Sequence, residues 1–516
     1  MKNFLLPVLA LSLLGSCSVQ KELVEVKKTP KEIFVLFNKN LKPFYHGVAS
    51  GDPLQDAVII WTRVTPEVGV NSLEVTWSMS LNEDMSNPIK SGSTKTNAEK
   101  DYTVKIDVKG LEAGTTYYYQ FQALGAKSII GRTKTAPSKD QSQDLAFAFA
   151  SCSNYEWGYF NGYAQMAEDD ELNAIIHLGD YIYEYAPGGY GDTTIGRIVY
   201  PQKEITTLED YRHRYSQYRT DEDLMRAHQM HPFITIWDDH ELANNAWLDG
   251  AQNHNEDEGE GNWGFRKNWA RQVYYEWMPV RDANELYRSF QFGNMAHLIM
   301  LDTRLTGRTE QVDSMQAVNY ADPERTIIGK KQFSWLVKEL QTSATWKIIG
   351  NQVPFGPMIN DYMEGKGRYM DGWDGYPVER ERLINEITEH NIADLIWMTG
   401  DYHSSFAFET DLNASKQIDE SNIGVEFVVP SINSANTNEY VDDERTSEIE
   451  AKYLEYNPHL RYVNLRDHGY VNLKLTNQAA EATFIYSKTT RERNKAIKAQ
   501  EKMRVQKSTK KIERID

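Results

Sequence analysis

From residue 145 onward, short apolar runs alternate with longer stretches in which apolar residues recur every three or four positions. Runs of four to eight apolar residues are typical of buried strands, and the longer spacing is typical of helices that cover a sheet. This alternation predicts an α/β core. The expected strands are residues 145–150, 174–178, 233–237, 296–301, 346–349, 395–398 and 425–429, with helices around 333–340 and 379–387 and a closing hairpin of strands 470–475 and 482–486.

Residues 43–137 have a different pattern. Short apolar and β-branched runs at 58–61, 73–79, 102–108 and 117–121 are separated by Asp, Asn, Gly and Pro. Closely spaced short strands with turn residues between them predict a small antiparallel β-sandwich, of the fibronectin or immunoglobulin type. We therefore expect this N-terminal domain to precede a larger domain at residues 138–489.

The first residues indicate export. A basic start is followed by an apolar run at residues 4–14, which is too short to span a bilayer. The run ends in Leu14-Gly15-Ser16-Cys17, which resembles a bacterial lipobox. Residues 1–17 are thus expected to be a lipoprotein-type signal peptide with Cys17 as the lipidated residue; ordinary signal cleavage is the alternative. The polar, Lys-rich residues 18–42 are interpreted as a tether with little fixed structure.

The C-terminal tail, residues 490–516, carries ten Lys and Arg against four Asp and Glu. Its composition favours helix, but Ala496, Ile497 and Met503 offer only a thin apolar stripe. Charge runs are usually solvated, so we favour a frayed, solvated helix over an electrostatic arm.

Composition narrows the function. The 516 residues are 40% hydrophobic and 25% charged, which is ordinary globular usage. The net charge of −18 repels nucleic acid and anionic membranes, so no nucleic-acid partner is expected beyond a possible substrate. Membrane attachment is expected only through lipid at Cys17. An anionic substrate would need cations at its site, and two cysteines cannot form a disulfide framework.

Candidate chemistry follows four predicted strands. Their ends carry Ser151-Cys152-Ser153-Asn154, Gly179-Asp180-Tyr181-Ile182-Tyr183, Asp238-Asp239-His240-Glu241 and Gly400-Asp401-Tyr402-His403. Ligands bind beyond the carboxyl ends of strands in α/β sheets, so these side chains are expected to meet in one site. Carboxylate, phenol, imidazole and thiol groups together offer both hard and soft metal ligands.

Each of these groups also has a simpler explanation. A single Asp after a strand is most often a helix cap, and a buried Cys is usually a small hydrophobe. We interpret His177 as structural on the same grounds. The segment Asp238–Glu241 is harder to explain in this way, because adjacent carboxylates repel one another unless cations compensate.

Seven motifs resemble the PhoD-like alkaline phosphatase/phosphodiesterase family of calcineurin-like metallophosphoesterases. They are GVASGDP (47–53), FASCSNYEWGYF (149–160), HLGDYIYEY (177–185), WDDHE (237–241), LDTR (301–304), DGWDGYP (371–377) and TGDYHSS (399–405). The resemblance covers most of residues 43–435. It implies an α/β fold in which a metallophosphoesterase β-sandwich is flanked by helices.

The resemblance also implies a metal centre. Fe³⁺ would be held by Cys152, Asp180, Tyr183 and His403, which would explain a free thiol in an exported protein. Asp180 would also face a second site, usually Ca²⁺, with Asp239 and Asp401 as further ligands. Gln352 matches a position often occupied by His in the superfamily, and whether Gln352 or Asn351 points inward stays open. Hard oxygen ligands suit calcium rather than zinc.

The implied activity is hydrolysis of small phosphate esters through a binuclear or larger centre and a metal-bound hydroxide. His240 matches an imidazole that contacts phosphate and protonates the leaving group. Asn154 is a candidate donor to a phosphoryl oxygen, and Ser153 is not expected to be a nucleophile. Arg304 is a candidate phosphate clamp or a structural ion pair. The loop with Trp373, Asp374 and Tyr376 either rims the pocket or packs as a turn.

One departure from the family concerns export. Exported members typically carry a twin-arginine signal, and this N-terminus has no Arg. A lipoprotein signal without that pair implies Sec export to the periplasm or cell surface of a bacterium. Two alternatives remain: a phosphodiesterase or phospholipase for head groups or nucleic acid ends, and a non-catalytic surface-binding lipoprotein.

Overall fold

The structure is a computed structural model that describes residues 30–67, 70–360, 363, 365–411 and 422–515. The predicted signal peptide, Cys17 and the first part of the tether lie outside these residues. Within the described part of the chain, no helix is long and apolar enough to cross a membrane.

A ten-stranded sheet runs through both predicted domains, in the order β22-β21-β20-β19-β9-β10-β11-β1-β2-β5. Strands β9, β10 and β11 are parallel, and β1 pairs in parallel with β11. The bounds are β1 Val48–Gly51, β2 Ala57–Arg63, β5 Thr103–Lys109, β9 Leu145–Ala150, β10 Ala174–His177, β11 Pro232–Thr235, β19 Gly469–Leu475, β20 Ala479–Ser487, β21 Ile497–Gln506 and β22 Ile512–Ile515.

A seven-stranded sheet packs against it, in the order β12-β13-β14-β15-β17-β16-β18. Its central strands β13, β14, β15 and β17 are parallel. The bounds are β12 Arg288–Phe292, β13 Ala296–Met300, β14 Trp346–Asn351, β15 Leu395–Thr399, β16 Ser405–Asp411, β17 Asn422–Val428 and β18 Leu460–Asn464.

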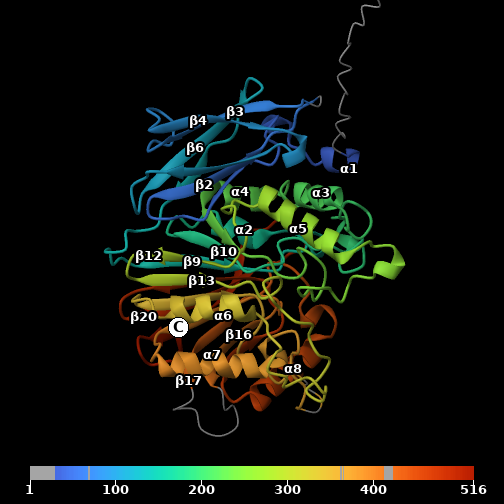
Figure 1. The fold of residues 1–516 in the computed structure, drawn as a ribbon, viewed down its shortest axis with the longest axis vertical. Helices are drawn as coiled ribbons and strands as arrows, with labels where there is room; N and C mark the ends of the chain where they lie inside the picture. Colours follow the sequence, from blue (N-terminus) through green and yellow to red (C-terminus); the bar gives the residue numbers. More distant parts are fainter. Residues whose placement is uncertain (1–29, 68–69, 361–362, 364, 412–421, 516) are drawn as a thin grey trace, which may run out of the picture.

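Helices cover the outer faces of the two sheets (Figure 1). Alternating residues of β13 show why: Leu298 and Met300 belong to the apolar cluster shared by both sheets, whereas Ile299 packs with Leu336 and Leu383 of the helices α6 and α7. The helices are α1 Lys31–Phe34, α2 Asn161–Met166, α3 Leu208–Tyr218, α4 Glu222–Met230, α5 Trp263–Trp277, α6 Gly329–Leu340, α7 Pro377–Glu389 and α8 Asp443–Tyr456.

The small sandwich sits at one end of the molecule (Figure 1). A five-stranded sheet of β3 Leu73–Ser80, β4 Lys90–Thr96, β6 Thr116–Ala123, β7 Ala126–Lys127 and β8 Gly131–Lys134 packs on β2 and β5 through its own apolar core. The α/β fold with a helix-flanked β-sandwich and a preceding small β-sandwich is confirmed. The small sandwich is also hydrogen-bonded to the large domain, because β1 links β2 to β11.

The tail is not a frayed helix, so that interpretation is wrong. Its β21 pairs along the whole of β20, and β22 pairs with β21. Met503 and Val505 are buried two residues apart, which is the period of a strand and not of a helix. The backbone N–H and C=O groups along the edge of β20 pair with those of β21. If the tail were a solvated helix, these groups of β20 would be left without strand partners.

The tether prediction is also wrong for its last part. Residues 31–34 form α1 and residues 39–41 form a short 3₁₀ helix. Ile33 and Phe37 are buried against Tyr45, and the rings of Phe37 and Tyr45 are stacked at 4.4 Å. These side chains bury apolar surface, which stabilises the segment. The prediction missed this packing because lysines dominate the composition of the segment.

Candidate metal centre

The predicted ligands meet where parallel strands of both sheets end. Cys152 follows β9, Asp180 follows β10 and Asp239 follows β11 in the ten-stranded sheet, while Asp401 and His403 follow β15 in the seven-stranded sheet. A parallel bridge between Ser151 and Ser431 joins the loops of the two sheets at this point. The centre therefore lies at the carboxyl edge of the sandwich, as expected for an α/β fold.

Four of these ligands have a left-handed backbone. The φ angles are 58° at Cys152, 58° at Asp180, 65° at Asp401 and 61° at His403. Non-glycine residues seldom adopt this conformation, which costs of order 1–3 kcal/mol each and is concentrated at functional sites. The sharp turn after each strand directs the side chain inward, and the surrounding structure holds that strain.

Gly179 allows two ligand loops to approach closely. Its φ is 110°, and a Cβ atom at this position would lie 2.3 Å from the Cβ of Asp238. Only glycine fits both the conformation and the space. This contact brings Asp180 beside the Asp238-Asp239 pair.

The first group of ligands consists of Cys152, Asp180 and His403. One donor atom from each lies within 4.8 Å of the others. The hydroxyl of Tyr183 joins them, lying 3.0 Å from Asp180 Oδ2 and 3.1 Å from His403 Nε2. The structure thus brings together all four residues expected to hold the iron.

His403 is oriented from behind. Its Nδ1 lies 3.0 Å from the carbonyl oxygen of Ala435 and 3.0 Å from the hydroxyl of Tyr190. A carbonyl only accepts, so Nδ1 carries the proton and donates it. The lone pair is then on Nε2, which faces Tyr183 and Asp180, and this is the arrangement of a metal-ligating histidine.

Two further groups share residues with the first. Asp180, Asp239 and His240 form the second group, and Asp238, Asp239 and Asp401 form the third, each within 4.8 Å. Asp180 is common to the first and second groups, and Asp239 to the second and third. Shared carboxylates are how metal ions a few ångströms apart are held in one centre.

The electrostatics of these carboxylates call for cations. Asp180 Oδ1 and Asp238 Oδ2 are buried and accept no hydrogen bond within the described part of the chain. Burial raises the pKa of Asp180 and of Asp238 well above the usual value, and the charge of Asp239 raises both further, although His240 opposes this at Asp180 and Arg304 at Asp238. Burial and the charge of Asp371 raise the pKa of Asp401 to about 7. Orphaned oxygens in such surroundings fit divalent or trivalent metal ions.

The electrostatic argument for a cation also applies to the thiol of Cys152. Burial, reinforced by the charge of Asp180, raises the pKa of Cys152 well above its usual value. A thiolate at this position would need a cation beside it, since the thiolate and not the thiol is the metal ligand. The donor set at the first group therefore fits a metal that accepts thiolate, phenolate and imidazole together.

His240 is fixed by a buried carboxylate. Its Nδ1 lies 2.7 Å from Glu184 Oε2, and its ring lies against that of Tyr183 with centroids 4.3 Å apart. Burial alone would lower the pKa of His240, but the charges of Asp239, Glu184 and Asp180 raise it well above its usual value. The geometry permits two roles, proton donor or metal ligand, because His240 also belongs to the second group.

Arg304 lies among the carboxylates and is fully buried. Its nitrogens lie 2.5 Å from Asp238 Oδ1, 2.8 Å from Asp371 Oδ2 and 3.3 Å from Asp401 Oδ1. Of the two interpretations of Arg304, the geometry favours the structural ion pair over the phosphate clamp. A guanidinium engaged with several carboxylates has few donors left for a phosphoryl group.

Gln352 is a corrected prediction. Its Nε2 donates to the carbonyl of Leu301, and its Oε1 accepts from the amide and the hydroxyl of Thr303. Asn351 is engaged as well, with its Oδ1 accepting from Trp373 and its Nδ2 donating to Val353. Both amides tie loops together in a fully buried place, so neither is placed as a metal ligand.

Asn154 also has a different task from the expected one. Its Oδ1 caps the 3₁₀ helix Tyr155–Trp157 by accepting from Glu156, and its Nδ2 donates to the carbonyl of Tyr190 at 2.9 Å. The hydroxyl of Ser153 lies 2.6 Å from that of Tyr163 and shares a hydrogen bond with it, which agrees with the expectation that Ser153 is not a nucleophile.

Two structural interpretations agree with the geometry. Burial lowers the pKa of His177 to about 3, and this neutral ring lies in the core. Trp373 and Tyr376 are buried in the cluster beneath α6 and α7, and Asp374 pairs with Arg380 at 2.6 Å. This loop is therefore packed as a turn, except that Asp371 at its start reaches the carboxylate network.

Several residues of the site were given no individual role by the sequence analysis. Glu241 accepts from the amides of Asp180, Tyr181 and Asp238 at 2.7–3.0 Å, and so fastens two ligand loops together. Asp238, Asp371, Glu184 and Glu241 all stand inside the seven motifs, which is the signal that could have found them. Tyr190 stands outside every motif and carries no such signal.

Comparisons with known proteins identify the family of the chain. The sequence model of the PhoD-like phosphatase family matches residues 147–484, and that of the PhoD-like phosphatase N-terminal domain matches residues 32–137. The chain is 35% identical to alkaline phosphatase D of Bacillus subtilis (strain 168) over 464 residues, covering 86% of this chain and 77% of the relative.

Solved structures extend the comparison. A structure described as PhoD superposes with a TM-score of 0.83 at 33% identity, covering 93% of both chains. A purple acid phosphatase, PPD1 from yellow lupin (Lupinus luteus) seeds, superposes with a TM-score of 0.55 at 14% identity, covering 86% of this chain and 72% of the other. The second likeness concerns the fold alone.

Proposed function

This chain belongs to the PhoD-like phosphatase family and is a phosphoric ester hydrolase, and we propose that the hydrolysis takes place at the metal centre described above. The observation that carries this proposal is the chain of three ligand groups joined by Asp180 and Asp239 at the ends of four strands from two sheets. Adjacent buried carboxylates with unpartnered oxygens are costly in a protein unless cations accompany them.

We assign Fe³⁺ to Cys152, Asp180, Tyr183 and His403, and Ca²⁺ to Asp180, Asp239 and Asp401 with Asp238 alongside. The first set contains the soft thiolate and the phenolate, and the second consists only of hard carboxylate oxygens. When bound, such ions would neutralise charge on the phosphoryl oxygens and lower the pKa of a water molecule.

The protein's own groups would handle the leaving group. Glu184 holds the imidazole of His240 through Nδ1, so that a proton on Nε2 can pass to a departing alkoxide. Asp239 Oδ1 accepts from the amide of His240 at 3.1 Å, which fixes the carboxylate next to the imidazole in one tight loop. Arg304 compensates part of the carboxylate charge and keeps Asp238 in place.

The proposed substrates are small phosphate esters. The net charge of −18 repels a nucleic-acid polymer. A nucleic acid would therefore be a substrate only through a phosphate ester at its end. The family membership does not favour a non-catalytic surface-binding protein.

Metal analysis combined with kinetics tests the proposal. Purified protein should contain iron and calcium, and it should hydrolyse p-nitrophenyl phosphate or its bis-ester with an activity that EDTA abolishes. Turnover of the two esters also decides between monoester and diester preference. Full activity in metal-free protein would refute the proposed centre.

For location, we propose an exported bacterial lipoprotein of the cell envelope, anchored at Cys17 after Sec export. The support is the pattern of residues 1–17 alone. Cys152 is a buried free cysteine, and in an oxidising compartment a bound metal would account for a thiol that forms no disulfide.

A further inference from the structure

The basic tail contains a segment that the proposed function does not use. Residues 488–496, here called the strap, leave β20 and cross the loops beside the metal centre before β21 begins. Four of its side chains are basic: Lys488, Arg491, Arg493 and Lys495.

Backbone hydrogen bonds hold the strap in place. The carbonyl of Thr490 accepts from the amide of Tyr159 at 2.7 Å. The amide nitrogen of the Asn161 side chain donates to the carbonyls of Thr489 and Glu492 at 2.6 and 2.8 Å, and its oxygen accepts from the amide of Asn494 at 3.0 Å. The strap is thus seated on the loop that carries Cys152 and on the start of α2.

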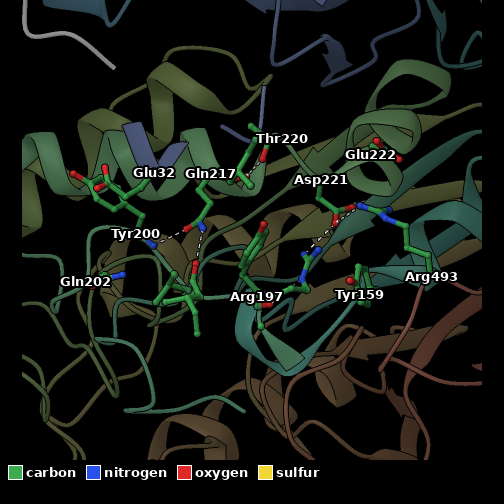
Figure 2. A pocket seen from close by; sticks show the side chains of 15 residues that line it. Glu32, Tyr159, Arg197, Tyr200, Gln202, Gln217, Thr220, Asp221, Glu222 and Arg493 are labelled. Atoms are coloured by element: carbon green, nitrogen blue, oxygen red, sulfur yellow. Dashed lines mark hydrogen bonds and ion pairs between the residues drawn. The ribbon is translucent and has the colours of Figure 1, made fainter. Parts of the chain in front are cut away.

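Its arginines reach two other segments. Arg493 pairs with Asp223 at 2.6 Å and with Asp221 at 3.3 Å, and Asp221 pairs in turn with Arg197 at 3.0 Å (Figure 2). Arg197, Asp221 and Arg493 line a cavity of about 500 Å³. Arg491 pairs instead with Asp192, which caps the 3₁₀ helix Thr193–Ile195.

Asp192 belongs to a loop that touches the metal centre, residues 186–196, here called the Tyr190 loop. The hydroxyl of Tyr190 lies 3.0 Å from His403 Nδ1, and the carbonyl of Tyr190 accepts from Asn154 at 2.9 Å. Glu156 holds the loop at a further point by accepting from the amide of Gly188 at 2.9 Å. The Cys152 segment therefore holds the backbone of the loop at Gly188, at Tyr190 and at Asp192, whose amide donates to the carbonyl of Glu156 at 3.3 Å, and the strap holds the side chain of Asp192.

The ion pair is suited to hold the loop. Hydrogen bonds from Thr194 and from Arg491 lower the pKa of Asp192 to about 2, so its carboxylate is charged at every physiological pH. Its side chain is 19% exposed, and that of Arg491 is 53% exposed. The pair lies at the surface, so salt would weaken it.

We propose that Arg491 is a positioning residue for the metal centre: by holding Asp192 it fixes the Tyr190 loop, and Tyr190 in turn orients His403. This inference rests on the proposed function, because His403 is assigned there as an iron ligand. Groups that orient a metal-ligating histidine affect metal affinity or activity by 10–100-fold when they contact it directly. Arg491 acts two contacts away through an exposed pair, so a smaller effect of about three- to tenfold is expected.

The test uses the full chain with Arg491→Gln and three further variants. Arg491→Lys keeps the charge and should restore most of the effect. Lys495→Gln is the matched control, because Lys495 is a strap cation that pairs with Glu168 and not with the Tyr190 loop. Asp192→Asn removes the partner's charge while an Asn side chain can still cap the 3₁₀ helix.

Hydrogen–deuterium exchange of the full-length protein as purified is the first measurement, since its readout is neither metal content nor activity. Peptides covering residues 186–196 should exchange faster in Arg491→Gln and Asp192→Asn than in wild type or Lys495→Gln. The second measurement is iron release to a chelator and kcat/KM. Both should change about three- to tenfold in the same two variants, and the double variant should be no worse than either single one.

Unchanged exchange of residues 186–196 in Arg491→Gln would overturn the inference, as would equal effects of Arg491→Gln and Lys495→Gln. Failure of the proposed function looks different: the wild type itself would then lack iron or phosphatase activity, whereas the exchange experiment would still report on the loop.

Discussion

His240→Ala separates proton donation from metal binding. We expect kcat to fall by about two to four orders of magnitude for an alkyl phosphate, whose leaving alkoxide needs a proton. The loss should be much smaller for p-nitrophenyl phosphate, because its phenolate leaves without one. Iron and calcium contents should stay close to wild type.

The expected loss of rate can be expressed as a free energy and compared with the cost of the substitution to stability. Tenfold in rate corresponds to about 1.4 kcal/mol, so the expected loss is about 3–5 kcal/mol of transition-state stabilisation. His240 is 2.7 Å from Glu184, which also accepts from the amide of Asn244 at 2.7 Å and from Asn253 at 3.0 Å. Removing the ring leaves one buried carboxylate oxygen without a partner, which costs about 1–3 kcal/mol of stability.

A second variant controls for that loss. His240→Asn places an amide nitrogen at the position of Nδ1, so it can still donate a hydrogen bond to Glu184 but cannot act as a general acid. It should therefore recover the melting temperature and not the activity on alkyl phosphate. Steady-state kinetics on both esters, with elemental analysis of each variant, decide the matter. Equal losses on the two esters would refute proton donation by His240. Loss of calcium in His240→Ala would show that His240 is a metal ligand, as its place beside Asp180 and Asp239 also permits.

The other predictions concern the ligands and the anchor. Asp239→Ala should lose calcium and activity together, since Asp239 belongs to two ligand groups, and retention of both would exclude it as a ligand. Cys152→Ser should lose most iron and most activity while the fold survives, because a hydroxyl is a poor substitute for a thiolate; native protein should be violet or blue from tyrosinate–iron charge transfer, and a colourless, iron-free, active enzyme would refute the iron assignment. Cys17→Ala should leave the membrane fraction or fail to mature, and unchanged membrane association with normal signal removal would argue against lipidation.

Several strands could be predicted from the sequence almost to the residue. Residues 145–150 were expected as a strand and form β9, because every position is apolar and both faces of the strand are covered. Ends were less accurate for helices: α6 begins at Gly329, four residues before the expected start, since its first turn is polar and carries no periodic signal. The strand β21, which lies between β20 and the edge strand β22, was missed because Lys, Arg and Gln occupy every second position along it.

Part of the metal centre could also be predicted from the sequence, and part of it could not. The motifs identified Cys152, Asp180, Tyr183, Asp239 and His403, because each stands at a fixed place after a strand whose end the apolar pattern reveals. They misplaced Gln352, whose amide is used entirely by Leu301 and Thr303. Which of two adjacent polar residues points into a site depends on the backbone after the strand, and sequence spacing does not report that.

The sequence by itself determined the α/β class, the strand ends that bear chemistry and the kinds of ligand available, since hydrophobic period and residue type are local properties. Only the tertiary structure decided which carboxylates share a metal group, that Arg304 is tied up by them, and that the tail closes the sheet and straps the Tyr190 loop. Those facts rest on contacts between segments as much as 300 residues apart, such as Arg491 with Asp192. Packing brings such groups together, and no pattern within either segment encodes the distance between them.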